Sequence, residues 1–329
     1  MFKFMGYPRA NGTAGIRNYV VVIPTVACVN GVADSIARRV PGVIPLFHGH
    51  GCGRMAPDLT IHTRVLAGIC KNPNVYGVLA IGLGCEFIKV KPFAELVAES
   101  GKPVEYLNVQ TDGGTVKVVE EGSKIVQRLL GEAAAQEKQE FGLDKIVMGL
   151  ECGGSDALSG VTANPAVGKV TDWLVDNGGT AILTEVTEMI GTQHILKKRC
   201  ATPEMGDYLA GVIDQQEADA ASILGEGTSK AIISPGNMDG GMSSIREKSL
   251  GCICKAGTST INEVVAYGAE PTRKGLVVME GPGYDIDSIA GEAASGCNIM
   301  IFTTGRGNPV GFPIMPVIKV ASNSDLYGR

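Results

Sequence analysis

The sequence predicts an α/β protein: a Rossmann-like, doubly wound parallel sheet domain followed by a second α/β domain. Short apolar runs alternate with amphipathic helical runs four times in the first part of the chain. The chain also has 329 residues, more than a single core usually accommodates. We therefore expect a Rossmann-like domain at 1–140 and a catalytic α/β domain at 141–329, divided near the polar stretch 132–138.

The first domain is expected to contain four strands, each followed by a helix. The strands are expected at 19–26, 42–47, 75–83 and 104–109. The helices are expected at 32–39, from about 59 to 71, at 90–99, and from 114 to about 140. Short turns between such elements indicate parallel strands joined by right-handed crossovers, so the strand ends that carry ligand-binding turns share one edge.

The second domain repeats this pattern less regularly. Strands are expected at 145–149, 179–184, 275–279 and 298–302, with helices at 166–177 and 203–221. The loop at 234–241 is too rich in glycine to predict regular structure.

Composition excludes several classes of protein. A net charge of −5 and the lack of a long Lys/Arg run argue against nucleic-acid binding. No segment has the roughly 18 uninterrupted apolar residues of a membrane span, and the N-terminus has no apolar signal region. We expect a cytoplasmic protein. Its nine cysteines then indicate reduced thiols, metal ligation or catalysis, and not a disulfide framework.

Four cysteines stand just past expected strand ends, in turns that also carry glycine, histidine or carboxylate side chains. They are Cys28, Cys52, Cys85 and Cys152. Because the carboxyl ends of parallel strands meet at one edge, we expect these thiols to line one rim and to ligate iron or zinc. The other five are interpreted as small buried hydrophobic residues: Cys70, Cys200, Cys252, Cys254 and Cys297.

The turn 150–165, between an expected strand and an expected helix, contains many polar side chains. Core packing does not require polar groups there, so the turn is a candidate site. Beside Cys152 it carries Ser155, Asp156 and Asn164. A second glycine-rich turn contains His48 and His50, either of which is suited to ligate a metal or to act as a general base.

Arg306 follows the strand at 298–302, and it is interpreted as a clamp for a substrate carboxylate, with hydroxyl donors from Thr303 and Thr304. Arg17 is a weaker candidate for the same role. The sequence leaves open whether Glu185 and Glu188 are helix-capping acids or catalytic groups. It likewise leaves open whether Lys248 and Lys255 are surface charges or an acid/base pair.

Motifs along nearly the whole chain resemble those of the altronate and galactarate dehydratase family. They are the segments 15–19, 48–52, 81–86, 152–165, 184–188, 234–237, 248–251, 302–307 and 316–319. The resemblance implies an iron-dependent dehydratase that eliminates water from a sugar acid, such as altronate or galactarate, to give a 2-keto-3-deoxy acid. A sister branch, the sulfolactate sulfo-lyase large subunit, is the alternative.

The resemblance also implies partners. The chain begins directly with the catalytic region, so a separate small SAF-domain subunit is expected, within a homo- or hetero-oligomer. The family usually extends well past the strand at 316–319, whereas this chain stops at Arg329, so a C-terminal helical piece is expected to be missing or reduced.

The expected mechanism is a metal-assisted β-elimination. Catalytic roles are assigned to His48, His50, Glu185 and Lys255; substrate binding is assigned to Arg17, Ser155, Asp156, Asn164, Thr303, Thr304 and Arg306. Two forms of iron remain open: a mononuclear ferrous site using His48 or His50 with carboxylate oxygens, or a [4Fe–4S] cluster held by three of the four strand-end thiols. Mn²⁺ is considered as a substitute metal.

Two other classes of function are considered. A dinucleotide oxidoreductase would need a Gly-x-Gly-x-x-Gly turn after the first strand, and residues 25–30 lack it. A non-catalytic subunit that only binds sugar acids would have no use for the strand-end thiols.

Overall fold

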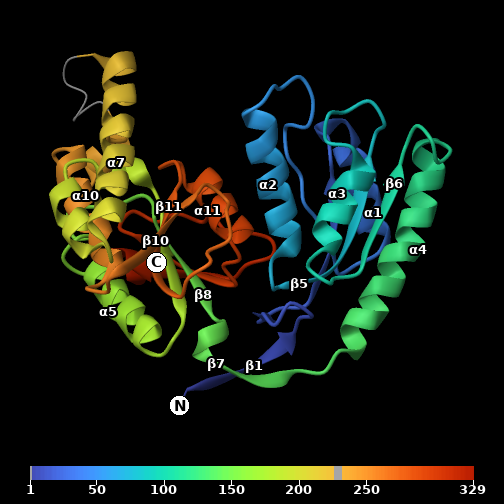
Figure 1. The fold of residues 1–329 in the computed structure, drawn as a ribbon, viewed down its shortest axis with the longest axis horizontal. Helices are drawn as coiled ribbons and strands as arrows, with labels where there is room; N and C mark the ends of the chain where they lie inside the picture. The colour runs from blue at the N-terminus through green and yellow to red at the C-terminus, as the bar shows by residue number, and fades with distance from the viewer. Residues whose placement is uncertain (1, 226–231) are drawn as a thin grey trace.

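The computed structural model describes residues 2–225 and 232–329, in which two parallel α/β sheets lie side by side (Figure 1). A small third sheet joins them below. In the part of the chain described, no helix is both long and apolar enough to cross a membrane. The predicted fold class, a Rossmann-like α/β domain followed by a second α/β domain, is confirmed.

The first sheet has four parallel strands covered on both faces. In spatial order they are β4 (Val43–Pro45), β3 (Tyr19–Pro24), β5 (Val75–Gly82) and β6 (Val104–Asn108). Helices α1 (Asn30–Arg39) and α4 (Gly114–Ala135) cover one face, and α2 (Asp58–Lys71) and α3 (Val90–Ala98) cover the other. Successive side chains of a strand point to opposite faces, so Val20 and Val22 pack toward α1 and α4, whereas Val21 and Ile23 pack toward α2 and α3.

The second sheet has six strands, all parallel. In spatial order they are β10 (Ile261–Ala266), β11 (Gly275–Glu280), β9 (Thr180–Leu183), β8 (Val147–Cys152), β12 (Ile299–Thr304) and β13 (Val317–Ala321). The chain leaves β8 toward β9 on one side and later returns to β12 on the other. The strand order therefore reverses beside β8, and in open α/β sheets such a reversal opens a crevice at the carboxyl ends of the strands.

The third sheet ties the N-terminus to the segment between the two domains. Strand β1 (Lys3–Pro8) pairs antiparallel with β2 (Ala14–Gly15) and β7 (Gln139–Gly142). The prediction that α4 continues to about residue 140 is therefore wrong: the helix ends at Ala135. Gln136 donates to the carbonyl of Pro8 and accepts from Arg9, and these bonds redirect the chain into β7.

The glycine-rich segment 234–241 also differs from its prediction. It contains a short helix, α9 (Pro235–Asp239), whose N-terminus is capped by Ser234 accepting from the backbone N–H of Asn237. A serine cap followed by proline at the first helical position offsets the low helix propensity of the glycines.

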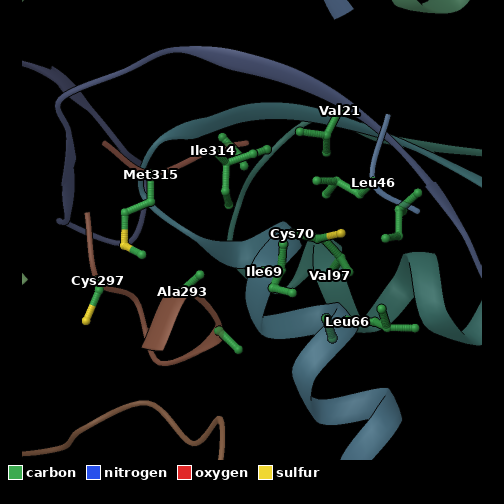
Figure 2. Close-up of a cluster of buried hydrophobic side chains, with 14 of the residues drawn as sticks. Val21, Leu46, Leu66, Ile69, Cys70, Val97, Ala293, Cys297, Ile314 and Met315 are labelled. Atoms are coloured by element: carbon green, nitrogen blue, oxygen red, sulfur yellow. The ribbon is translucent and has the colours of Figure 1, made fainter. Parts of the chain in front are cut away.

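The two domains share a hydrophobic core. Helix α2 of the first domain packs against α11 (Asp285–Ala294) of the second, and Gly68 permits this contact because a Cβ there would lie 2.5 Å from the carbonyl oxygen of Ala294. Figure 2 shows Leu66 and Ile69 of α2 facing the same cluster as Ala293 and Ile314. The domains are thus packed together through a continuous apolar interface.

Buried asparagines add directional bonds to this interface. The amide of Asn72 donates to the carbonyls of Ala293 and Cys297, both at 2.8 Å. The amide of Asn74 donates to Asn298 and Ile314, at 2.8 and 2.9 Å, while its oxygen accepts from the backbone N–H groups of residues 16 and 17. Each bond has one defined geometry, so together they fix how the first domain sits on the second.

Replacing Asn74 with Ala is expected to lower the free energy of unfolding by about 2–4 kcal/mol, because several buried backbone groups lose their partners at once. Urea unfolding followed by circular dichroism measures the change. Asn177→Ala, which removes an exposed bond to Trp173, is the control and should cost less than about 1 kcal/mol. Equal losses in the two variants would contradict the role given to Asn74.

Candidate active site

A buried group of ionisable side chains lies at the carboxyl edge of the second sheet. Strand β8 ends at Cys152, and β9 is followed by Glu185 and by the 3₁₀ helix η3 (Val186–Met189), which carries Glu188. Lys248 comes from α10 (Ile245–Cys252), and Lys255 from η5 (Ile253–Ala256). All five side chains are buried. The group sits beside the reversal of strand order, where a ligand site is expected.

Two ion pairs organise this group. Lys255 Nζ donates to Glu185 Oε2 at 2.5 Å, and both residues are fully buried. Lys248 Nζ pairs with Glu188 Oε1. Cys152 joins the two pairs, because its backbone N–H donates to Glu185 Oε2 at 3.3 Å and its thiol donates to Glu188 Oε2 at 3.1 Å.

Glu185 has a left-handed backbone, with φ of 66°, and it is the one non-glycine residue of the described chain with positive φ. This conformation is costly for a residue with a Cβ, and such strain is typical of functional sites. Here it occurs directly after β9, where the side chain turns toward Lys255. One carboxylate oxygen, Oε1, is buried and has no hydrogen-bond partner.

Further carboxyls lie behind this group. Ser288 donates to Glu151 Oε2 at 2.9 Å, and the backbone N–H of Leu150 donates to Glu292 Oε1 at 2.9 Å. The other oxygen of each carboxyl, Glu151 Oε1 and Glu292 Oε2, is buried without a partner. Buried polar atoms are rarely left unbonded, so their concentration here marks a site built to act on a ligand.

Burial and mutual repulsion change the pKa values of these carboxyls. Burial, with repulsion from Glu188, raises the pKa of Glu185 to about 7 despite the opposing Lys255. Burial raises the pKa of Glu292 to about 8 and raises that of Glu151 well above its ordinary value. For Glu188, burial is outweighed by Lys248, and its pKa is lowered. Carboxyls with separated pKa values can serve as distinct proton donors and acceptors near neutral pH.

The expectation that four thiols share one rim is wrong for Cys152. It belongs to the second sheet, whereas Cys28, Cys52 and Cys85 follow β3, β4 and β5 of the first. The interpretation of Cys252 as an ordinary core residue also needs correction. Donor atoms of Cys152, Glu185, Glu188 and Cys252 all lie within 4.8 Å of one another, and a hydrogen bond with the Cys252 thiol, together with burial, raises the pKa of Cys152 well above its ordinary value.

The histidines lie in the first domain. His48 Nε2 bonds to the carbonyl of Pro24 at 2.7 Å, and its Nδ1 accepts from the backbone N–H of His50 at 3.2 Å. Both ring nitrogens thus hold the loop in shape. The His50 ring packs against the His62 ring at a tilt of 59°, with centroids 4.4 Å apart. Among the described residues, neither of the two groups of converging metal donors contains a histidine.

Some of the residues assigned to substrate binding are hydrogen-bonded to other protein groups, and the others are available to a ligand. Thr303 donates to Asn164 at 2.6 Å, and Thr304 accepts from the N–H of Gly307 at 3.1 Å. Asp156 accepts from Ser322, at 2.7 Å, and from two further side chains, which hold its pKa low despite burial. These bonds shape the loops around the site.

Three other residues of that set remain available for a ligand. The hydroxyl of Ser155 is buried without a partner, at the turn that follows β8. Arg306 is exposed on the loop after β12, where its guanidinium lies 3.8 Å from Asp239. Arg17 is exposed and lines a shallow surface depression with Lys319.

A cavity of about 790 Å³ lies between the domains. The first domain lines it with the loop that contains His48, His50 and Arg54, together with residues of α2. The second domain contributes Val186, next to Glu185, and the segment that follows β11. The cavity is therefore bordered by the carboxyl ends of strands from both sheets.

Two family descriptions match the chain, one for each of its domains. Residues 143–329 match the family described as D-galactarate/altronate dehydratase, C-terminal, and residues 6–134 match D-galactarate dehydratase/altronate hydrolase, second domain. The chain belongs to this family. The two matches correspond to the second and the first sheet.

Several named relatives are similar over nearly the whole chain. Altronate dehydratases of Bacillus subtilis and Escherichia coli are each 36% identical over 98% of this chain. The chain covers 66% of the length of each. Galactarate dehydratase (L-threo-forming) of Escherichia coli is 36% identical over 100% of the chain and 66% of its own length. The (2R)-sulfolactate sulfo-lyase subunit beta of Chromohalobacter salexigens is 32% identical, over 97% of this chain and 82% of its own length.

Replacing Lys255 with Met is expected to destabilise the fold by about 3–5 kcal/mol, because Glu185 is left as a buried charge without its partner. Urea unfolding measures this loss, and the double variant Lys255→Met/Glu185→Gln should recover most of it. Lys197→Met, which breaks an exposed pair with Asp207, is the control and should cost less than about 1 kcal/mol. A double variant no more stable than Lys255→Met would contradict a paired buried charge.

Proposed function

We propose that this chain catalyses the dehydration of a sugar acid to a 2-keto-3-deoxy acid. Its relatives named altronate dehydratase and galactarate dehydratase support a dehydration reaction. The observation that carries this proposal is the buried array of paired carboxyls, amines and thiols beside β8. Removing a proton next to a carboxylate demands a strong, positioned base and stabilisation of the negative charge that develops. The array contains groups for both tasks.

Glu185 is the proposed base. Its Oε2 is held by Lys255 and by the N–H of Cys152, whereas its Oε1 is unbonded and free to accept the proton from C2 of the substrate. A pKa of about 7 makes its ionised form available at neutral pH while keeping it basic. Lys255 positions this carboxylate and balances its charge.

Lys248, Glu188 and Cys152 form the second part of the proposed mechanism. Lys248 is a fully ionised, buried cation, since the facing carboxylates and the Cys152 thiol raise its pKa although burial opposes this. A buried ammonium stabilises the enediolate more strongly than an exposed one would. Arg306, exposed on the loop after β12, is proposed to bind the substrate carboxylate through its planar guanidinium.

Iron is part of the proposal as a Lewis acid that would draw electron density from the departing C3 hydroxyl. The chain offers two sets of donors for such an ion. The group containing Cys152, Glu185, Glu188 and Cys252 converges, but both its carboxylates are already bonded to ammonium groups, so we assign it to proton transfer. The remaining strand-end thiols are soft donors suited to iron and carry no competing cation. Mn²⁺ prefers oxygen ligands and is a poorer match for them.

The sulfo-lyase reaction is the second candidate, favoured by the similarity to the sulfolactate sulfo-lyase subunit over 82% of that protein. Both reactions begin by removing a proton next to a carboxylate, so the same array serves either one. A panel of altronate, galactarate and sulfolactate, assayed for keto acid and for sulfite, separates them. The assay should be run with and without a small SAF-domain protein, the proposed partner subunit. No turnover under any of these conditions would favour a binding subunit.

Glu185→Gln is expected to reduce kcat about 10²–10⁴-fold, because the amide keeps the shape of the side chain but cannot accept the C2 proton. Steady-state kinetics on the substrate with the highest turnover measures the effect. Glu204→Gln, at an exposed acid in the first turn of α7 (Pro203–Leu224), is the matched control. Retention of full activity by Glu185→Gln would exclude this carboxylate as the base.

The pH dependence of kcat/KM tests the same assignment independently. Because Glu185 must be ionised to act and its pKa is raised to about 7, kcat/KM should fall about tenfold per pH unit below that value. Circular dichroism at each pH shows whether the protein remains folded over the range. A profile that is flat between about pH 5 and 8 is incompatible with Glu185 as the base.

A further inference from the structure

The first domain contains three exposed thiols that the fold brings to one edge. Cys28, Cys52 and Cys85 follow three neighbouring strands, and all three are solvent-exposed. Cysteine is among the most buried residue types in proteins, so three exposed cysteines at one sheet edge need a reason other than packing. Cys152, the fourth strand-end thiol, lies in the other sheet.

Hydrogen bonds tie the three loops together close to these cysteines. The N–H of Ala27, next to Cys28, donates to the carbonyl of His50 at 2.8 Å. The N–H of Phe87, two residues past Cys85, donates to the carbonyl of Gly51, the neighbour of Cys52, at 3.3 Å. The loop that carries Cys52 is thus bonded on one side to the Cys28 loop and on the other to the Cys85 loop.

The loops are also shaped to approach one another closely. Gly51 has φ of 108°, and a Cβ at this position would lie 2.3 Å from the carbonyl oxygen of Thr25. Glu86 is buried and accepts from Thr25 Oγ1 and from the backbone N–H groups of residues 83 and 84. Its carboxylate is therefore occupied within the loops and is not available as a metal ligand.

We propose that Cys28, Cys52 and Cys85 hold a [4Fe–4S] cluster through three of its irons, and that the fourth iron has no protein ligand. Each thiol loses its proton as its Sγ bonds to one iron. Soft thiolates suit iron–sulfur clusters better than they suit magnesium, calcium or manganese. Three thiols supply one ligand fewer than the four cysteines that usually hold such a cluster.

The position of the thiols relates this cluster to the cavity between the domains. The loop that carries Cys52 also lines the cavity with His48, His50 and Arg54, and the opposite wall includes Val186 beside Glu185. An iron without a protein ligand at this edge would be available to a substrate hydroxyl, with the base supplied by the second domain. This last step rests on the proposed dehydratase function, whereas the binding of the cluster does not.

The test uses the full chain purified anaerobically and measures bound metal without any turnover. We expect about four iron and four acid-labile sulfide per chain, with the broad visible absorption of sulfide-to-iron charge transfer. Cys28→Ser, Cys52→Ser and Cys85→Ser should each lose most of the iron and sulfide. Iron without sulfide, zinc in place of iron, or full retention in all three variants would each overturn the proposal.

Control variants show whether the cluster is held by the three exposed thiols of the first domain or by thiols of the second domain. Cys152→Ser and Cys252→Ser should keep the cluster, as should Cys254→Ser at a half-exposed thiol of the second domain. Thermal unfolding shows whether a variant that lost its cluster still folds. Cluster loss in Cys152→Ser but not in Cys28→Ser would assign the metal to the second domain and overturn the proposal.

Oxidation tests the open iron itself. One equivalent of ferricyanide accepts one electron, upon which the unligated iron leaves as Fe²⁺ and a three-iron cluster with an EPR signal remains. Adding ferrous iron and a reductant should restore the original spectrum. A four-iron cluster that gives no such signal would show a fourth protein ligand and overturn that part of the proposal. Because these readouts need no substrate, a failed dehydratase assay would leave the cluster result standing.

Discussion

The carboxamide of Asn74 is the contact on which the arrangement of this protein depends. It donates to the backbone of the second domain on one side and accepts from the backbone N–H groups of residues 16 and 17, just before β3, on the other, at a fully buried position. A buried amide has to satisfy all its partners, so it permits one relative placement of the domains. That placement brings the carboxyl ends of strands from both sheets to a common cavity.

The second domain buries ionisable side chains in its interior, where charged groups are costly to accommodate. Carboxyls, amines and thiols are buried together, and each ion pair is maintained because losing one partner would strand the other charge. The left-handed backbone of Glu185 adds conformational strain to the energetic cost of burying these charges. Packing alone gives no reason for either feature, whereas the proposed proton transfer, which requires groups with separated pKa values, would give one.

The two domains differ in the type of chemistry that they offer. The first presents exposed thiols on loops that glycines allow to approach one another, whereas the second presents buried acids and amines on the ends of strands and short helices. Soft ligands suit a metal, and separated acids and bases suit proton transfer. The proposed elimination would use both, and the cavity between the domains is lined by loop residues that neighbour each set, His50 in the first domain and Val186 in the second.

The sequence by itself determined the α/β class, because the alternation of apolar strands and amphipathic helices is a local property. It also determined that Cys28, Cys52, Cys85 and Cys152 lie at or just after the carboxyl ends of strands. Only the tertiary structure decided that Cys152 contacts Glu185 and Glu188 instead of sharing a rim with the other three thiols, and that Cys252, from an ordinary helical segment, joins it. Glu185 with Lys255 became a pair through contacts between residues 70 positions apart. Such contacts depend on the order of strands in the sheet, which the local pattern of residues does not encode.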